Sequence, residues 1–315
     1  MRIRMKNEKR KSRIRNIAEN GISGDDVFDF FNIVLLTIFA IIVFYPMYFV
    51  VIASISSPSA VASGQVVLLP KGNNFLGFQR VLRDERLKTG YLNSTIYTVV
   101  GVIVNLVMTL PAAYVLSRDD FKLKKPLTIF IIFTMFFGGG MIPNFIVVKQ
   151  LGLLDKIWAL VLPGAISTSK LILARTFFQT TIPDELFDSA LIDGCGNFKF
   201  FINIVIPISG AIIGILALQY GIEHWNAYGS ALLYIYNPKK YPLQLILRDI
   251  LLRSQITAKQ MESEESDALL SVLMQQISES IKYVIVIAAC LPIVVVLPLI
   301  KKYFAKGIMI GSIKG

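Results

Sequence analysis

Long apolar runs separated by short polar segments are the main pattern of this chain. Residues 30–54 and 91–117 contain no charged side chain, and each run exceeds the roughly 20 apolar residues with which a helix crosses the hydrocarbon core of a bilayer. The pattern predicts six membrane-spanning helices. Five are at residues 28–54, 92–116, 126–148, 202–226 and 282–300, and the fourth in chain order follows Lys156 and runs to about residue 178. The fold class is therefore predicted to be an all-α integral membrane protein.

The fourth predicted span is too short unless it includes a charge. Only thirteen residues separate Lys156 from Lys170, so the span must continue to about residue 178, and Pro163 and Gly164 should divide it into two pieces. Lys170 then lies at membrane depth. Two interpretations stay open: its ammonium snorkels to the interface, or it is a functional charge in a transport pathway.

Three consecutive glycines, Gly138–Gly140, interrupt the third predicted span. Glycine lets another helix approach closely, and a broken helix is tolerated in a membrane where it is buried or lines a cavity. The glycines therefore indicate either tight helix packing or the lining of a substrate path, for which Gly139 and Gly140 are the candidates.

Basic residues indicate the orientation of the chain. The segments on the side of both termini, 1–27, 117–125, 181–200 and 301–315, carry 17 Lys and Arg in 71 residues, against 12 in 97 for residues 55–91, 149–156 and 229–280. Lys and Arg are enriched in cytoplasmic loops. The termini are therefore expected to be cytoplasmic, and residues 55–90 and 229–280 are expected to be external loops.

Residues 183–194 predict a short helix outside the membrane. Pro183 suits the first helical position, and Gly194 and Gly196 supply the backbone freedom to end it. One arc of this helix is acidic and the opposite arc is apolar, with Ile192 an exception among the acids. The acidic arc comprises Asp184, Glu185 and Asp188; the apolar arc comprises Leu186, Phe187, Ala190 and Leu191. Because a helix of about eleven residues is marginal in water, it needs a docking partner, which could be another protein.

This segment resembles the coupling helix of bacterial ABC importer permeases. Their pattern is P-x-E-L-x-E-A-A-x-x-D-G-A, followed by an aromatic residue and I-x-x-P. The matching residues here are Pro183, Glu185, Leu186, Asp188, Ser189, Ala190, Asp193, Gly194, Cys195 and Pro207. The chain departs with Asp188 for Glu, Ser189 for Ala and Cys195 for Ala, which keep charge or size. The resemblance implies that Glu185, Asp188, Ser189, Ala190, Asp193 and Gly194 form the contact with an ATPase subunit.

The resemblance extends over nearly the whole chain. Residues 138–167, Trp225–Asn226, Pro242–Gln244 and the closing residues 306–315 resemble the carbohydrate-uptake permeases, close to the group for complex oligosaccharides. This implies the type I ABC importer permease fold, with six transmembrane helices and a cytoplasmic coupling helix. It also implies a heterodimer with a second, homologous permease, two ATPase subunits, and an extracellular solute-binding protein that delivers an oligosaccharide.

ATP chemistry is expected in the partners and not in this chain. The sequence lacks the G-x-x-x-x-G-K-[ST] phosphate loop, so ATP and Mg would be bound by the ATPase subunits and no cofactor or metal is expected here. The expected organisation is a basic cytoplasmic arm at 1–27, a permease domain at 28–303 and a cytoplasmic tail at 304–315. The resemblance places this tail between the two ATPases.

Composition and charge also predict an integral protein of the cell membrane. The chain is 54% hydrophobic and 17% charged, whereas soluble domains are about 25% charged. Its net charge of +11 does not indicate nucleic acid, because no aromatic residue lies among the basic residues of the N-terminal arm. Contact with anionic lipid is expected instead. No cleavable signal peptide is expected, nor a disulfide between Cys195 and Cys290.

The far end of the fifth span carries Glu223, His224, Trp225 and Asn226. These side chains could bind a sugar by ring stacking and by hydrogen bonds to hydroxyls, or they could form an aromatic belt at the outer interface. They make no catalytic set, since no Cys or second acid accompanies His224.

Two other classes of function remain open. An ion-coupled secondary transporter would need acids within its spans or internal repeats, and the spans are almost free of Asp and Glu apart from Asp29 and Glu223 near their ends. A membrane enzyme would need a cluster of reactive side chains, and the sequence shows none.

Overall fold

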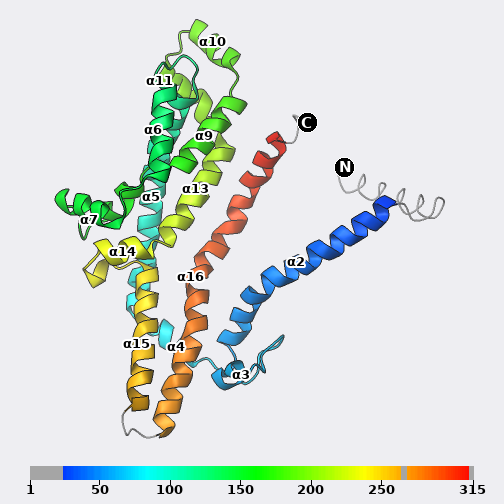
Figure 1. Cartoon of the computed structure of the whole chain (residues 1–315), viewed down its shortest axis with the longest axis vertical. Helices are drawn as coiled ribbons and strands as arrows, with labels where there is room; N and C mark the ends of the chain where they lie inside the picture. Colours follow the sequence, from blue (N-terminus) through cyan, green and yellow to red (C-terminus); the bar gives the residue numbers. More distant parts are fainter. Residues whose placement is uncertain (1–23, 264–267, 312–315) are drawn as a thin grey trace. The chain divides into compact units, whose positions relative to one another are not determined.

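The computed structural model describes residues 24–263 and 268–311, and every regular element in these ranges is helical (Figure 1). Three helices are long and apolar enough to cross a membrane: Val27–Ser54, Arg86–Ser117 and Val272–Val296. Two bent pairs raise the number to five, Lys124–Phe136 with Met141–Gln150 and Asn197–Ile208 with Gly210–Trp225. The all-helical membrane class is thus confirmed, with three to five candidate spans in the described residues.

The chain divides into two compact units, residues 1–75 and residues 76–315. In the first unit α2 (Gly24–Ser54) is followed by the short α3 (Pro58–Ala62). The segment after α3 folds back onto the end of α2, where Tyr45 Oη donates to Val67 O at 3.1 Å and Tyr48 Oη donates to Leu68 O. The expected basic arm at 1–27 lies outside the described residues as far as residue 23.

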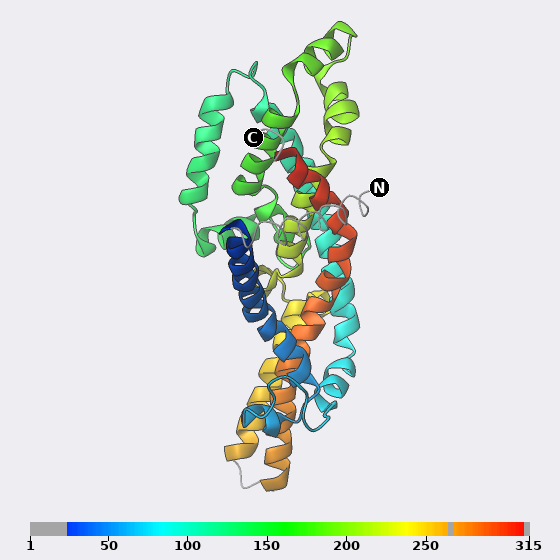
Figure 2. The ribbon, with the colours of Figure 1, turned by 90° about the vertical axis from the view of Figure 1, so that its right-hand side faces the viewer.

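The second unit is built around α5 (Arg86–Ser117), which packs against α9 (Thr168–Thr181) and α13 (Gly210–Trp225). Its largest core joins the last turns of α5 to α9, α13 and the segment after residue 189. The buried members at its centre are Ala113, Ala174, Phe178, Phe200, Val205 and Leu216. In both views α5 runs alongside α13 (Figures 1 and 2).

The third and fourth predicted spans are broken. The third bends by 113° between α6 (Lys124–Phe136) and α7 (Met141–Gln150). The fourth consists of α8 (Trp158–Val161), the 3-10 turn η1 (Leu162–Gly164) and α9, which confirms the break at Pro163 and Gly164. α9 has 14 residues, or about 21 Å at 1.5 Å per residue, so neither piece crosses the bilayer alone.

The fifth span begins with a π-helical turn. α11 (Asn197–Phe200) leads into η2 (Phe201–Val205) and α12 (Ile206–Ile208), and the axis then bends by 80° into α13. Pro207 lies at this point and cannot donate a backbone hydrogen bond. α10 (Asp184–Ile192) precedes this region and lies at one end of the second unit, with α11 nearby (Figure 1).

The expectation that residues 229–280 form a loop is wrong, because the segment is helical. α14 (Tyr228–Tyr234) and the 3-10 turn η3 (Pro238–Lys240) lead to α15 (Leu243–Ser263), which pairs with α16 (Ala268–Gly311). The hairpin forms the end of the second unit opposite α10 (Figures 1 and 2). α16 has 44 residues, about 66 Å, and so it extends well beyond a hydrocarbon core of about 30 Å.

Residues 55–90, also expected to be a loop, contain α3, α4 (Leu76–Leu82) and the first turn of α5. α4 packs on α16, where Gly77 lies so close that an added Cβ would be 2.9 Å from Ser280 Cβ. The sixth span lies within α16, whose helix continues to Gly311. The side chains of the proposed tail, 304–315, lie outside the described residues.

Candidate functional site

The predicted helix at 183–194 is present as α10, with an N-cap at Pro183 and a C-cap at Asp193. Its last turn ends in a Schellman motif: Gly194 N donates to Leu191 O at 3.0 Å and Cys195 N donates to Ala190 O at 2.9 Å. Gly194 has φ +73, a conformation that residues with a Cβ resist. These bonds satisfy carbonyls that would otherwise be unpaired at the helix end.

The apolar side of α10 is anchored to the core of the second unit. Ala190 is buried, and the ring of Phe187 meets Phe200 edge-on with centroids 5.2 Å apart. The guanidinium of Arg118, which follows the end of α5, lies 3.5 Å from the centroid of Phe187. Arg118 also pairs with Asp120 at 2.7 Å and lowers the pKa of that carboxyl. α10 is therefore fixed to the end of α5 by packing and by a cation–π contact.

The opposite side of α10 presents acids and apolar side chains together. Glu185, Asp188, Ser189, Asp193 and Gly194 are exposed, as is Asp184, whereas Ala190 faces inward. Leu191, which was expected on the inner arc, is 58% exposed, and Ile192 and Phe198 are 87% and 79% exposed. Large apolar side chains gathered on an exposed surface indicate a protein contact. We call the exposed residues Glu185, Asp188, Leu191, Ile192 and Asp193, with Phe198 of α11, the α10 surface.

A second group of functional candidates forms a polar network between α5, η1, α9 and α13. Lys170 Nζ lies 2.5 Å from Glu223 Oε1 and 4.5 Å from the ring centroid of Tyr220. The Lys170 side chain is only 7% exposed, whereas that of Glu223 is 61% exposed. Snorkelling of Lys170 is thus wrong, because its side chain is buried and its ammonium is paired with Glu223.

The same network satisfies the backbone at the break in the fourth span. Asn105 Nδ2 donates to Gly164 O at 2.7 Å and to Ala165 O at 2.9 Å, and its Oδ1 lies 2.6 Å from Nε2 of His224. At the start of α9, Ser167 N donates to the hydroxyl of Tyr220 at 3.2 Å. Backbone groups released by a broken helix must find such partners, because the bilayer core supplies none.

The network lies near the middle of the predicted span at residues 92–116. Asn105 is twelve residues from Ser117 at the end of α5, about 18 Å at 1.5 Å per residue, and half the hydrocarbon thickness is about 15 Å. Glu223 and His224 are tied to this level by their bonds to Lys170 and Asn105. A charged side chain at such a depth borders water or protein and not lipid.

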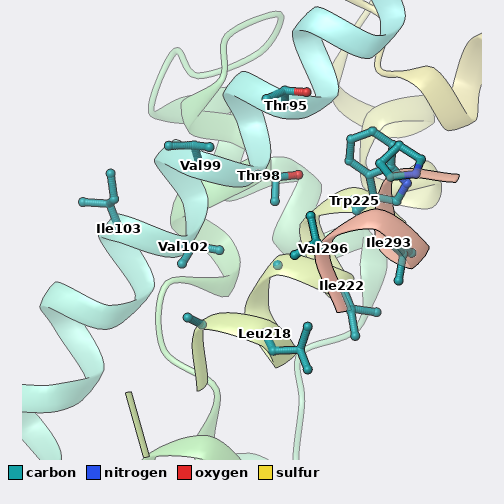
Figure 3. A pocket seen from close by; sticks show the side chains of 13 residues that line it. Thr95, Thr98, Val99, Val102, Ile103, Leu218, Ile222, Trp225, Ile293 and Val296 are labelled. Atoms are coloured by element: carbon teal, nitrogen blue, oxygen red, sulfur yellow. The ribbon is translucent and has the colours of Figure 1, made fainter. Parts of the chain in front are cut away.

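Trp225 and Asn226 lie apart from this network. The Trp225 ring is buried between α13 and α16, where Nε1 donates to Ala289 O at 3.0 Å, so a surface belt is the wrong interpretation for it. It lines a cavity of about 400 Å³ (Figure 3) whose other walls are apolar side chains and two threonines, including Val99, Thr98, Ile222 and Ile293. Asn226 accepts a bond from Gln244 Nε2 at 3.3 Å. Such an apolar cavity offers few partners for sugar hydroxyls.

The glycine candidates lie in the bend between α6 and α7. An added Cβ would meet nothing within 4 Å at Gly138 or Gly140 and only Pro143 at 3.7 Å from Gly139. Tight packing within the second unit is therefore the wrong interpretation. Gly140 has φ +81, so the run opens the helix, and Figure 1 shows α7 turned away from α13.

The sequence alone did not indicate three members of the network: Asn105, Thr109 and Tyr220. The Thr109 and Tyr220 hydroxyls lie 2.8 Å apart, and both residues are buried, as is Asn105. A buried asparagine in a span is a signal that could have been used, since polar side chains there hydrogen-bond across helices. Among the residues that the structure describes, no three His, Cys, Asp or Glu side chains gather as metal ligands.

Comparisons with known proteins point to one family. No protein-family model matches the sequence. The chain is 37% identical over 289 residues to the polygalacturonan/rhamnogalacturonan transport system permease protein YtcP of Bacillus subtilis, covering 92% of this chain and 99% of that protein. It is 25% identical over 290 residues to the arabinooligosaccharides transport system permease protein AraQ of Halalkalibacterium halodurans, covering 89% and 96%. A solved bacterial ABC transporter involved in the import of the acidic polysaccharide alginate matches with a TM-score of 0.75 and 31% identity, over 90% of this chain and 99% of that one.

Proposed function

The chain belongs to the permease subunits of carbohydrate-uptake ABC importers, which are not themselves ATPases, and from this premise we propose how it works. It is a multi-pass membrane protein that passes oligosaccharides, delivered by a solute-binding protein, into the cytoplasm. A second, homologous permease completes the pore, and two ATPase subunits drive it. The names of the relatives, which include transporters of polygalacturonan and arabinooligosaccharides, support this substrate class.

Six spans are proposed for this subunit. Three are single helices and two are the bent pairs; the sixth is the broken segment α8–η1–α9, whose exposed backbone ends are capped by Asn105 and Tyr220. With the termini in the cytoplasm, α10 is cytoplasmic and the α15–α16 hairpin is external. The position of these two features at opposite ends of the second unit supports their placement on opposite sides of the membrane, and the basic residues beside the termini support the cytoplasmic side for α10.

The α10 surface is the proposed ATPase contact, and it carries the functional conclusion. α10 is anchored on one side by Phe187 and Ala190 and leaves its acids exposed on the other. A carboxylate at Asp188 can form a charge-assisted contact with a basic group that becomes partly desolvated on docking. Motion of the ATPases can then reach the spans through the fixed joint between α10 and α5.

Charge reversal tests this assignment. We expect Asp188→Lys to lose the ATPase subunits during co-purification and to lose uptake by vesicles, because breaking one partner of such a pair costs about 2–5 kcal/mol. Asp184→Lys is the matched control: it reverses an exposed acid of the same helix, at a position outside the family pattern. Equal ATPase retention by the two variants would show that α10 is not the coupling element.

Orientation can be tested separately with single cysteines. Cys195 and Cys290 are free thiols and are first replaced by serine. Cysteines at the exposed positions Asn73 and Lys239 should react with an impermeant maleimide on intact cells, and a cysteine at Asn197 should react only after the membrane is opened. The opposite accessibility would refute the proposed topology.

The energy source separates this function from an ion-coupled transporter. Uptake should need ATP and should persist when ion gradients are collapsed.

A further inference from the structure

The two side chains of the Lys170–Glu223 pair differ in their exposure to solvent, which a purely structural ion pair does not require. The ammonium is 7% exposed and the carboxylate is 61% exposed, although the attraction between the two charges would be strongest if both were removed from water. The pair also lies near the middle of the membrane, where an exposed acid must border water or another protein chain. The open side of the pair therefore faces a space that is not lipid.

Contacts other than the one with Glu223 hold the Lys170 ammonium in place. The face of Tyr220 lies 4.5 Å from Lys170 Nζ, and the Tyr220 hydroxyl is fixed by Thr109 and by Ser167 N. A cation over an aromatic ring keeps part of its stabilisation when an anion leaves. An ammonium has three donors, and the carboxylate of Glu223 takes one of them from the exposed side. Another carboxylate could approach from that side and replace it.

We propose that Lys170 is a recognition site for a carboxylate on the transported sugar, and that Glu223 occupies this site until a uronate displaces it. The proposal rests on the proposed function and narrows its substrate class to acidic oligosaccharides. The exchange keeps one negative charge beside the buried ammonium at every stage, so Lys170 is not left unpaired, which would be costly. The similarity to an importer of an acidic polysaccharide is consistent with it.

The two members of the pair should respond in opposite directions. Lys170→Met removes the site, and it should lower uptake of an acidic sugar by about ten-fold or more, the effect of one hydrogen bond to a charged group. Glu223→Gln removes the competing carboxylate, and it should lower the concentration needed for half-maximal acidic uptake. A pair that only joined α9 to α13 would lose function with either change.

The experiment uses the complete transporter in proteoliposomes, with its binding protein and ATP. The probes are labelled trigalacturonate and its full methyl ester, which has the same sugar units without the charges. We expect wild-type protein to favour the acid, Lys170→Met to lose that preference while still importing the ester, and Lys149→Met, on an exposed lysine of α7, to behave as wild type. Binding of each probe to the binding protein is measured alone, so that its own preference is subtracted.

The outcomes distinguish failure of the uronate site from failure of the proposed sugar import. If wild-type transporter imports the ester or neutral oligosaccharides and Lys170→Met does not change the preference, the uronate site is refuted and the sugar importer stands. If wild-type transporter imports no oligosaccharide at all, the proposed substrate class fails, and the uronate site fails with it. If Glu223→Gln weakens acidic uptake as much as Lys170→Met does, the pair is structural.

Discussion

Replacing Asn105 by leucine should destabilise the second unit by an amount that its contacts define. The side chain makes three hydrogen bonds, to Gly164 O, Ala165 O and His224 Nε2, and it is fully buried. Side-chain hydrogen bonds between membrane helices contribute about 0.6 kcal/mol each on average, which gives roughly 2 kcal/mol for three. If the two carbonyls at the break in the fourth span are left without partners, the cost is instead about 1–3 kcal/mol each, or about 2–6 kcal/mol for both, so the expected loss is at least about 2 kcal/mol.

The assay is thermal unfolding of the purified protein in one detergent, followed by fluorescence of a thiol-reactive dye or by loss of the monodisperse peak. A loss of 1 kcal/mol lowers the melting temperature by about 2–4 °C for a unit of this size, so Asn105→Leu should melt at least about 4 °C below wild type. Thr98→Val is the matched control on the same helix, because the Thr98 hydroxyl is buried without a partner. Its removal should be neutral or slightly stabilising.

The reasoning is refuted if Asn105→Leu melts together with Thr98→Val. That result would mean that the carbonyls of Gly164 and Ala165 find other partners, and that the break in the fourth span does not depend on α5. A loss that appears in Asn105→Leu and not in His224→Leu would instead assign the energy to the two carbonyl bonds, since the His224 bond is broken in both variants.

Two further predictions concern local geometry. Gly194→Ala should destabilise the end of α10 by about 1 kcal/mol, because a Cβ resists φ +73, whereas Gly196→Ala should be neutral, since Gly196 has φ −69 and open space around it; equal melting temperatures would contradict this. Asp155→Asn should lower stability at neutral pH, because Lys240 and backbone N–H groups lower the pKa of the Asp155 carboxyl below 3.8. That contribution is present above pH 3.8 and is lost as pH falls through the folded-state pKa, so wild type and variant should converge in acid, and a constant gap would contradict the pairing.

The helix α10 could be predicted from the sequence because its signals are local. Proline and two acids stand at its start and glycine at its end, and the structure has α10 between Pro183 and Gly194. Leu191 was predicted to face the core, but it is exposed, because only part of the apolar arc of α10 packs on the core. A single sequence gives the arc but not which part of it the core covers.

The α15–α16 hairpin was missed because hydropathy was the criterion. α15 is polar overall, yet Leu243, Ile246, Leu247 and Ile250 repeat at the spacing of one helix face and are buried. This periodicity was available in the sequence. A mean over a window hides it, because the charged face of the helix cancels the apolar one.

The pairing of Lys170 with Glu223 could not be derived from the sequence, because the residues are 53 positions apart. One cation and one acid in two different spans are a hint that they meet, but distance along the chain gives no register between helices. Gly139 and Gly140, in contrast, act locally. The break that they predicted in the third span is present as the bend between α6 and α7.

Asn105 has a consequence for how related sequences can diverge. Its amide donates to two main-chain carbonyls, and no substitution at residues 164 or 165 can delete or alter those atoms. A change at residue 164 or 165 therefore cannot compensate for the loss of Asn105, and substitutions at position 105 should be limited to side chains that donate in the same place. Lys170 and Glu223 differ, because both partners are side chains and can change together. Relatives that import neutral sugars are free to exchange the charges for a neutral pair, whereas a donor at position 105 is needed whatever the substrate.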